Sequence, residues 1–472
     1  MSPSRILFLI PALAVAVAAC NRTPPKLVSY SIAQGPRGQL STVATYQAQN
    51  VTCARLTWTS DSDGAGSTAC AAASGAIGQV VALGLKPATS YDVTLELHSL
   101  SGITTSEPVA YTSPDLPDDL KALGIAVTGQ ATAGLTLTGV SLGANSYVIA
   151  FDGSGSIRWY QNLGASAWID AQQVASGDFT VFSGTSTGWV ATEGSFVEML
   201  PTGEAVASYA VDLPDYLDPH ELRVTYDANG VATFHYFTYV IEPYDLTSVG
   251  GTATSPLAMH SLVRQRLGEP RQVIWDAHGR VELSDRIEGP SPLTFGDLVH
   301  PNSIDFDLDG NYVVSMRNLG EVQKIDAQTG ATIWRLGGVH NQFTFVGDPL
   351  GGFSAQHSAR VLPNGNILIY DNGWRHSPWQ TRAVEYALDL DKKTATLVWE
   401  YRHGPEVFTP FMGSVQRLSS GATQVGFSQA GLVDEVDAQG NLVWEARLTN
   451  GNAPAVFYRA LRIAALDEYR QP

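Results

Sequence analysis

Basic residues are scarce in this chain of 472 residues. Lys and Arg number 28 against 45 Asp and Glu, and the formal net charge is -17 at pH 7. Binding to the phosphates of nucleic acids requires a basic stripe or patch, which this composition cannot supply. We therefore expect no nucleic acid or other polyanion among the partners of the protein.

Charged residues of both signs are also few. They make up 15% of the chain, whereas hydrophobic residues make up 44%. Disordered chains have the opposite balance, so the composition indicates a well-buried globular protein. Its 45 Gly and 25 Pro suit an all-β architecture with many turns.

The chain has little continuous apolar sequence except at its amino terminus. After Arg5, an apolar run extends over Ile6–Ala19, which matches the core of a secretory signal peptide and is too short to span a bilayer. The run ends in the small residues Val17-Ala-Ala-Cys20, which resemble the lipobox of bacterial lipoproteins.

From this resemblance we predict that residues 1–19 are a signal peptide and that Cys20 is acylated. Asn21, which follows, does not resemble the Asp signal that retains lipoproteins in the inner membrane. The expected location is the cell envelope, with a lipid anchor in the outer membrane facing the periplasm. An ordinary secretory signal with a chance cysteine is the alternative.

Cysteine is rare, with three in the whole chain. Removal of the signal peptide leaves Cys53 and Cys70 beside the acylated Cys20. In an oxidising compartment an even number of remaining cysteines favours a disulfide between them. Two unpaired buried cysteines are the alternative, and a metal site is less favoured because no histidine lies near the pair.

Residues 20–115 are predicted to form a small β-sandwich. The segment Leu85–Tyr91, with a hairpin at Ser101-Gly102, resembles the late strands of fibronectin type III or immunoglobulin-like modules. No cluster of titratable residues occurs in this part, so we expect a structural role. Its expected strands show alternating polarity and are Leu27–Ile32, Arg55–Trp58, Tyr91–Leu97 and Val109–Thr112.

Beyond a joint rich in proline and acidic residues, Pro114–Asp119, a hairpin unit repeats through residues 116–472. The unit is a β-run, a turn built on Asp, Gly or Asn, and a second β-run that often carries Trp. Such repetition predicts a six-bladed β-propeller. A long β-sandwich is disfavoured because sandwiches do not repeat one hairpin at nearly constant spacing. The six copies cover residues 148–159, 196–207, 261–275, 322–334, 383–399 and 433–444.

Matching inner strands are expected between these hairpins. They are Asp309–Ser315, Asn364–Tyr370 and Ser420–Gly426, each introduced by its own turn, and Phe457–Ala464 is expected to be the last strand. The spacing is less regular between Asp212 and Met259, where we expect loops.

Three histidines precede these turn-and-strand patterns in successive blades: His220, His300 and His357. Loops that enter the inner strands of a propeller meet at the mouth of its central channel. We therefore expect the three side chains to converge there. A lone histidine is more often a structural polar residue than a catalyst, but three at equivalent places favour an active site.

Arg317 ends the inner strand that begins at Asp309. A guanidinium pointing into the channel suits a tetrahedral oxyanion, and a structural ion pair is the alternative. The three histidines could instead hold a metal ion, which Arg317 beside them would repel.

Two runs of sequence resemble the bacterial arylsulfotransferase family, which needs no nucleotide sulfate donor (PAPS). The first joins His300-Pro-Asn-Ser-Ile, Asp309 to Arg317 and Thr329 to Gly338. The second is Gln356 to Gly373, followed by Arg382-Ala-Val-Glu-Tyr386. The resemblance covers roughly residues 123–463 and is strongest between residues 297 and 444.

This resemblance implies a propeller that moves a sulfuryl group from an aryl sulfate to a phenol without a cofactor. It places the nucleophile on His357, a supporting histidine and asparagine on His300 and Asn302, the arginine on Arg317 and a further histidine on His220. The expected partners are small phenolic donors and acceptors, and a homodimer is possible. The sandwich and the lipid anchor depart from the soluble periplasmic members of the family.

Two other classes of function compete. A non-catalytic propeller lipoprotein would use the ring as a protein-docking or adhesion surface and would not need His and Arg to converge. A quinone-dependent dehydrogenase is suggested by the recurrent tryptophans, but such propellers generally have about eight blades.

Overall fold

We analysed a computed structural model of the chain. It describes residues 23–35, 39–165, 170–187, 190–212, 214–287, 296–463 and 466. The predicted signal peptide and Cys20 lie outside these residues, so both remain predictions. No helix among the described residues is long and apolar enough to cross a membrane.

The amino-terminal part is a β-sandwich, as predicted. Alternate side chains of its strands are buried, and those of Leu56, Val80 and Val93 meet between the two sheets. The expected disulfide is present, because Cys53 is bonded to Cys70. One sheet has the order β1 (Lys26–Gln34), β2 (Ser41–Gln49), β6 (Ile77–Leu83). The other has the order β4 (Gly64–Ser67), β3 (Cys53–Ser60), β7 (Ser90–Ser99), β8 (Gly102–Thr105), with β5 (Ala71–Ala72) on β3 and β9 (Val109–Thr112) on β7.

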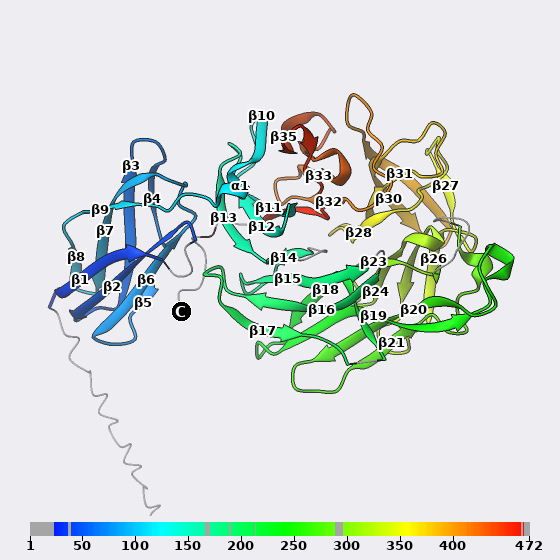
Figure 1. The fold of residues 1–472 in the computed structure, drawn as a ribbon, viewed down its shortest axis with the longest axis horizontal. Coiled ribbons are helices and arrows are strands. Elements are labelled where there is room, and N and C mark those ends of the chain that lie inside the picture. Colours follow the sequence, from blue (N-terminus) through cyan, green and yellow to red (C-terminus); the bar gives the residue numbers. More distant parts are fainter. Residues whose placement is uncertain are drawn as a thin grey trace, which may run out of the picture.

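The second part is a six-bladed β-propeller, which confirms the predicted fold class. Six antiparallel sheets are arranged around a central axis (Figure 1). The innermost strands of five of these sheets contact one another in succession around that axis. From the axis outward, the first three sheets are β37 (Ala460–Ile463), β11 (Leu135–Leu142), β12 (Asn145–Phe151), β13 (Ile157–Asn162); β14 (Ala171–Gln173), β15 (Phe179–Thr187), β16 (Val190–Met199), β17 (Ala205–Tyr209); and β18 (Tyr216–Tyr226), β19 (Ala232–Tyr244), β20 (Ser255–Arg266), β21 (Gln272–Asp276).

The other three sheets follow the same plan. They are β23 (Pro301–Phe306), β24 (Tyr312–Met316), β25 (Glu321–Ile325), β26 (Thr332–Gly337); β28 (His357–Val361), β29 (Ile367–Asp371), β30 (Arg382–Asp389), β31 (Thr394–Tyr401); and β32 (Ser414–Arg417), β33 (Thr423–Phe427), β34 (Leu432–Val436), β35 (Leu442–Asn450). Short additions are β22 (Gly296–Asp297) on β20, β27 (Thr344–Val346) on β31 and β36 (Ala453–Pro454) on β35.

The ring is closed at both ends of the propeller sequence. The carboxy-terminal β37 is the innermost strand of the first blade, where Ile463 pairs with Leu135. At the other end, the short helix α1 (Asp118–Lys121) leads into β10 (Leu123–Gly129), which adds to the outer edge of the last blade beside β35. Closure pairs edges that would otherwise be exposed, and the rival prediction of a long sandwich is wrong.

The predicted inner strands are the second strands of their blades rather than the first. The expected segments Asp309–Ser315, Asn364–Tyr370 and Ser420–Gly426 correspond to β24, β29 and β33. The innermost strands β23, β28 and β32 come just before them in the chain. They are short and carry polar residues, so they lack the continuous apolar run that marked their neighbours.

Local turn chemistry explains why the hairpins recur. In the turn between β23 and β24, the Gly310 amide donates to the Asp307 carbonyl (2.8 Å). Gly310 has φ +81°, which favours glycine because it has no Cβ. Tryptophans of the outer strands pack between blades, and the Trp159 ring lies 4.7 Å from the Phe179 ring of the next blade. These tryptophans are structural, and six blades argue against the quinone-dehydrogenase alternative.

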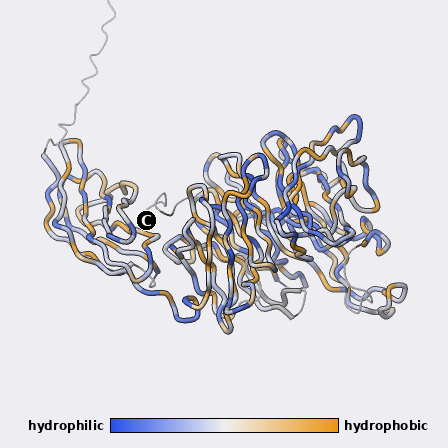
Figure 2. The backbone as a smooth tube through the Cα atoms, turned by 90° about the horizontal axis from the view of Figure 1, so that it is seen from above, coloured by the Kyte–Doolittle hydropathy of each residue, from blue (hydrophilic) through white to orange (hydrophobic). Residues whose placement is uncertain are grey.

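The sandwich packs against the first blade. Val81 and Leu83 of β6 share one apolar cluster with Leu135 of the propeller. Beside this cluster, the Arg158 guanidinium donates two hydrogen bonds to the Asp63 carboxylate, at 2.8 and 2.7 Å. In a view turned by 90° the two units lie side by side, and hydrophobic and hydrophilic segments alternate through both (Figure 2).

Candidate active site

The three predicted histidines lie together at the propeller axis. His220 is within β18, His300 directly precedes β23 and His357 begins β28, so each belongs to a different blade. The ring centroids of His220 and His300 are 4.6 Å apart, and those of His300 and His357 are 6.4 Å apart. All three side chains are buried or nearly so.

Asn372 determines the tautomer of His357. The Asn372 amide donates to the carbonyls of Thr409 (2.7 Å) and Met412 (2.9 Å), so its oxygen faces His357 Nδ1 at 2.8 Å. Nδ1 therefore carries the proton. The lone pair is on Nε2, which accepts a hydrogen bond from the Met412 amide at 3.2 Å.

His357 is neutral near pH 7. Burial, followed by the positive charge of Arg317 and the proximity of His300, holds the pKa of His357 well below its ordinary value of 6.5. A neutral imidazole with its lone pair on Nε2 is a competent nucleophile.

Arg317 begins the short helical turn η4 (Arg317–Leu319) that follows β24. Its guanidinium donates to the Asn318 side chain (2.9 Å) and to the Pro410 carbonyl (3.3 Å), and it lies 6.0 Å from the centre of the Trp374 ring. A guanidinium stays positively charged in proteins, and its planar set of N–H donors suits the oxygens of an anionic ligand.

Asp297 orients His300. Its carboxylate accepts a hydrogen bond from His300 Nδ1 at 2.5 Å, and the positive φ of His300 (+51°) turns the backbone between the two residues. Burial lowers the pKa of His300 to about 4 in spite of Asp297. Burial of Asp297 is outweighed by His300 and His260, which hold the pKa of this carboxyl well below its usual range. At neutral pH the pair is therefore an imidazole beside a carboxylate.

A fourth histidine, His260 in β20, joins two of these side chains. His220 Nδ1 lies 2.8 Å from Asp218 Oδ1, and His260 Nε2 lies 3.4 Å from the other oxygen of the same carboxylate. His260 Nδ1 in turn lies 3.9 Å from Asp297. Although burial opposes it, the two carboxylates raise the pKa of His260. The result is a buried chain of alternating imidazoles and carboxylates that connects His220 to His300.

Asn302 is fully buried beneath the histidines. Its amide donates to the Gln356 carbonyl at 2.8 Å, and its side-chain oxygen has no hydrogen-bond partner. A residue two positions after His300 is thereby tied to the residue that directly precedes His357. This contact places Asn302 at the site but uses one of the two hydrogens that an oxygen clamp would offer.

Tyr458, just before β37, brings a side chain from the closing segment of the ring to the site. Its ring centroid lies 5.8 Å from that of His220. The neighbouring Arg459 donates to Asp170 (3.0 Å) and lies 3.3 Å from Glu221. Glu221 also forms an ion pair with Arg360. This buried network joins the blades along the axis next to the histidines.

Several residues around the site were not predicted from the sequence. Asp218 and Asp297 precede His220 and His300 by two and three residues, a spacing that could have been noticed. Asn372 lies within the second family-like run. His260 is in the middle of a strand, far from the other site residues in sequence, and no local pattern identifies it.

One group of side chains away from the three histidines has the spacing of metal ligands. Among the described residues, one group of three His, Asp or Glu side chains has ligand atoms within 4.8 Å of one another: His403, Asp434 and Glu445. It lies in the last blade and includes none of the three predicted histidines.

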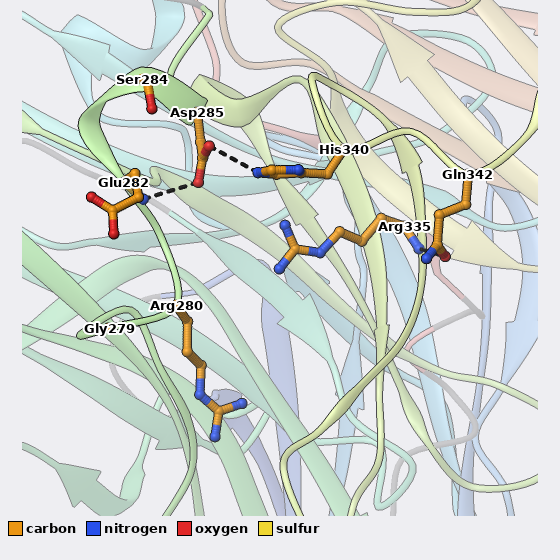
Figure 3. A pocket seen from close by; sticks show the side chains of 8 residues that line it. All are labelled: Gly279, Arg280, Glu282, Ser284, Asp285, Arg335, His340 and Gln342. Atoms are coloured by element: carbon orange, nitrogen blue, oxygen red, sulfur yellow. Dashed lines mark hydrogen bonds and ion pairs between the residues drawn. The ribbon is translucent and has the colours of Figure 1, made fainter.

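A polar pocket lies elsewhere on the propeller (Figure 3). In it, His340 Nε2 lies 2.8 Å from Asp285, and Arg335 points toward the space between them and Arg280. None of the predicted site residues lines this pocket. Its lining consists of Gly279, Arg280, Glu282, Ser284, Asp285, Arg335, His340 and Gln342.

The part of the chain that carries most of this site matches a known protein family. The family model described as "Arylsulfotransferase (ASST)" matches residues 269–449, a range that includes His300, Arg317 and His357. This segment of the chain is similar to the arylsulfotransferase family. The resemblance seen in the sequence is thereby confirmed, and the matched range is narrower than the expected residues 123–463 and excludes His220. No curated protein matches the chain.

Several solved structures are similar at low sequence identity. A protein of unknown function from Bacteroides caccae is 13% identical, with a TM-score of 0.41, over 70% of this chain and 98% of its own. One from Bacteroides thetaiotaomicron is 12% identical, with a TM-score of 0.33, over 91% and 99%. The virginiamycin B lyase of Staphylococcus aureus is 8% identical, with a TM-score of 0.33, over 68% and 88%. At these TM-scores the likenesses say nothing about activity.

Proposed function

We propose that this arylsulfotransferase-family protein transfers a sulfuryl group from an aryl sulfate to a phenol through a sulfohistidine on His357, without PAPS. The observation that carries the proposal is the tautomer of His357, in which Asn372 fixes the proton on Nδ1 and leaves the lone pair on Nε2. Arg317 next to it supplies the positive charge that a sulfate requires.

In the first half-reaction, His357 Nε2 attacks the sulfur of the aryl sulfate. The new N–S bond forms as the S–O bond to the aryl group breaks, and the electron pair leaves on the phenolate oxygen. Arg317 and the amide of Asn302 stabilise the charge on the non-bridging sulfate oxygens. The Met412 amide must release Nε2 during this step, since it donates to that lone pair in the resting site.

In the second half-reaction, the oxygen of the acceptor phenol attacks sulfur and the N–S bond breaks, which restores neutral His357. The phenol must lose its proton to a base. Because the pKa of His300 is about 4, its Nε2 is unprotonated at neutral pH and suits this role better than that of an acid. His220 is then the candidate donor to the leaving phenolate of the first step.

The lipid anchor on Cys20 belongs to the same proposal. It would hold the protein at the outer membrane facing the periplasm, and a homodimer is compatible with this arrangement. Radiolabelled palmitate incorporation into the wild-type chain, and its loss in Cys20→Ala, tests the anchor separately from the activity.

The decisive experiment is a burst measurement. The wild-type protein, mixed with an aryl sulfate and no acceptor, should release one equivalent of phenol per active site. His357→Asn should abolish this burst and reduce transfer by about 10³-fold or more, because it removes the attacking nitrogen and keeps a polar side chain. A burst that survives in His357→Asn would eliminate the sulfohistidine.

The pH dependence sharpens this test. Since burial and Arg317 lower the pKa of His357, the imidazole stays neutral as pH falls through 6.5. The burst amplitude should therefore persist well below pH 6.5 and decline only in more acidic solution. An inflection at the ordinary histidine pKa would contradict the role of His357 in this environment.

A further inference from the structure

Three aromatic side chains form an exposed cluster beside the candidate active site: Trp374, Trp379 and Phe408. We call this cluster the aromatic platform. The Trp379 and Phe408 rings are stacked, with centroids 5.3 Å apart and 21° between their planes. The Trp374 centroid lies 6.5 Å from Trp379 and 6.1 Å from Phe408.

The platform is exposed, although most aromatic side chains of this propeller pack between blades. Trp374 is 38% exposed and Trp379 is 64% exposed. Large aromatic surfaces that gather in contact with water generally mark a binding site, whereas single exposed apolar residues need no explanation.

The platform is joined directly to the reacting groups. The Trp374 ring lies 6.0 Å from the Arg317 guanidinium carbon. Trp374 follows Asn372, which holds His357, by two residues, and the carbonyl of Thr409, next to Phe408, accepts a hydrogen bond from the Asn372 amide at 2.7 Å. A ligand on these rings therefore lies next to the positive charge of Arg317, which also acts on His357.

Hydrogen bonds hold the two loops that carry the platform in one arrangement. The Thr381 hydroxyl donates to the Asn372 carbonyl at 3.0 Å and accepts from the Thr409 amide at 2.8 Å. The Thr381 amide donates to the Val407 carbonyl at 3.1 Å. A preorganised surface loses little conformational entropy when it binds a flat ligand.

From this placement we propose that the aromatic platform binds the planar aryl group of a substrate with two or more fused rings, while Arg317 binds its sulfuryl end. One benzene ring is too small to cover both indoles, whose centroids are 6.5 Å apart, whereas a fused bicyclic ring extends over them. The inference rests on the proposed sulfuryl transfer and adds its substrate class. The aryl group could be that of the donor or that of the acceptor.

The test compares substrates that differ by one ring. Donors are 2-naphthyl sulfate and phenyl sulfate with one common acceptor, and acceptors are 2-naphthol and phenol with one common donor. Trp379→Ala should lower the naphthyl-to-phenyl ratio of kcat/KM about threefold to tenfold, as expected for loss of aromatic stacking. The ratio for Trp379→Phe should lie between those of Trp379→Ala and the wild-type protein. Leu308→Ala, which removes a similarly exposed side chain (69%) in a distant turn, should leave the ratio unchanged.

The two substrate series together show whether the platform binds the aryl group of the donor or that of the acceptor. A fall confined to the sulfates assigns the platform to the donor, a fall confined to the phenols assigns it to the acceptor, and a fall in both assigns it to a shared site. An unchanged ratio in both series for Trp379→Ala would overturn the proposal.

Binding without turnover separates this inference from the proposed function. 2-Naphthol is titrated calorimetrically into His357→Asn and into His357→Asn with Trp379→Ala. Binding to the first and weaker binding to the second supports the platform even if the wild-type protein transfers no sulfuryl group. Equal binding to both variants contradicts the platform even if transfer is observed.

Discussion

The sandwich and the propeller bury different kinds of side chain. Among the residues of the sandwich that the structure describes, the buried polar ones are all uncharged: Gln39, Ser41, Thr42, Thr68, Thr89, Ser106 and Ser113. The propeller buries ionisable groups along its axis, among them Asp170, Glu221 and Arg459. Burying an ion costs several kcal/mol unless it is paired and hydrogen-bonded.

This difference indicates separate origins of stability. The sandwich depends on an apolar core and one disulfide. The propeller axis depends on ion pairs and hydrogen bonds among its buried charged groups, and the cost of burying them is understandable if these groups perform chemistry. Asp170 illustrates the cost, because burial, opposed by Arg459, raises its pKa to about 6.

Among the tests that compare the propeller with the sandwich, the largest effect is expected on the burst rate when Arg317 of the propeller is replaced. Arg317→Ala should slow the burst about 10²-fold to 10³-fold, because it removes the positive charge facing the sulfate oxygens. Arg317→Lys should recover part of the rate, since an ammonium keeps the charge without the planar fork. Stopped-flow release of the phenol measures both variants, and thermal melts check that they fold. Wild-type burst rates in Arg317→Ala would remove this residue from the mechanism.

The disulfide should affect the sandwich alone. Cys53→Ser with Cys70→Ser removes a bond that closes a loop with a sequence separation of 17, which should lower the stability of the sandwich by about 3 kcal/mol. Differential scanning calorimetry should then show an earlier transition for the sandwich and an unchanged one for the propeller. Loss of sulfuryl transfer in this variant would show that the two units are coupled.

His260 should act through its neighbours. His260→Gln should reduce transfer roughly tenfold to a hundredfold, less than removal of a group that touches substrate. His260 helps to stabilise the carboxylate form of Asp297, so without it this carboxylate attracts a proton to His300 more strongly and the pKa of His300 should rise above about 4. The acidic limb of the pH profile of the second half-reaction should therefore move to higher pH. A lower rate with an unmoved limb would indicate only a structural role.

The smallest effect is expected where the two units meet. A double-mutant cycle with Asp63→Asn and Arg158→Ala should give a coupling free energy of about 1 kcal/mol at neutral pH. Burial opposes ionisation of Asp63, but hydrogen bonds from Arg158 and Tyr91 keep the pKa of this carboxyl below 3.8. The coupling should thus be complete above about pH 4 and be lost as pH falls further. No coupling at pH 7 would leave only the apolar contacts between the units.

Much of the fold could be predicted because its signals are local. The hairpins around Gly310 and the other turns combine two β-runs with a turn residue that permits positive φ, and these features lie within about a dozen residues. The assignment of the inner strands was wrong because β23, β28 and β32 are short and polar. Their position next to the axis comes from the arrangement of the blades.

The site was predicted in part for the same reason. His300, Arg317 and His357 belong to runs of sequence that resemble a family, so they could be named before the structure was known. Asp218 and Asp297 lie two and three residues before His220 and His300, so their short spacing in the sequence indicates that they could contact these histidines. The aromatic platform could not be predicted, because Trp374 and Phe408 lie in different loops that are joined by Thr381.

By itself, the sequence determined the β-hairpin repeat, the blade number, the disulfide and the identity of three histidines and one arginine. Each of these is encoded by residues close together in the chain or by a recognisable run. Only the tertiary structure decided which groups meet: the tautomer of His357, the link through His260, and the contact of Tyr458 with His220. Those contacts join residues that lie far apart in sequence, and they exist because β37 closes the ring and brings all six blades to one axis.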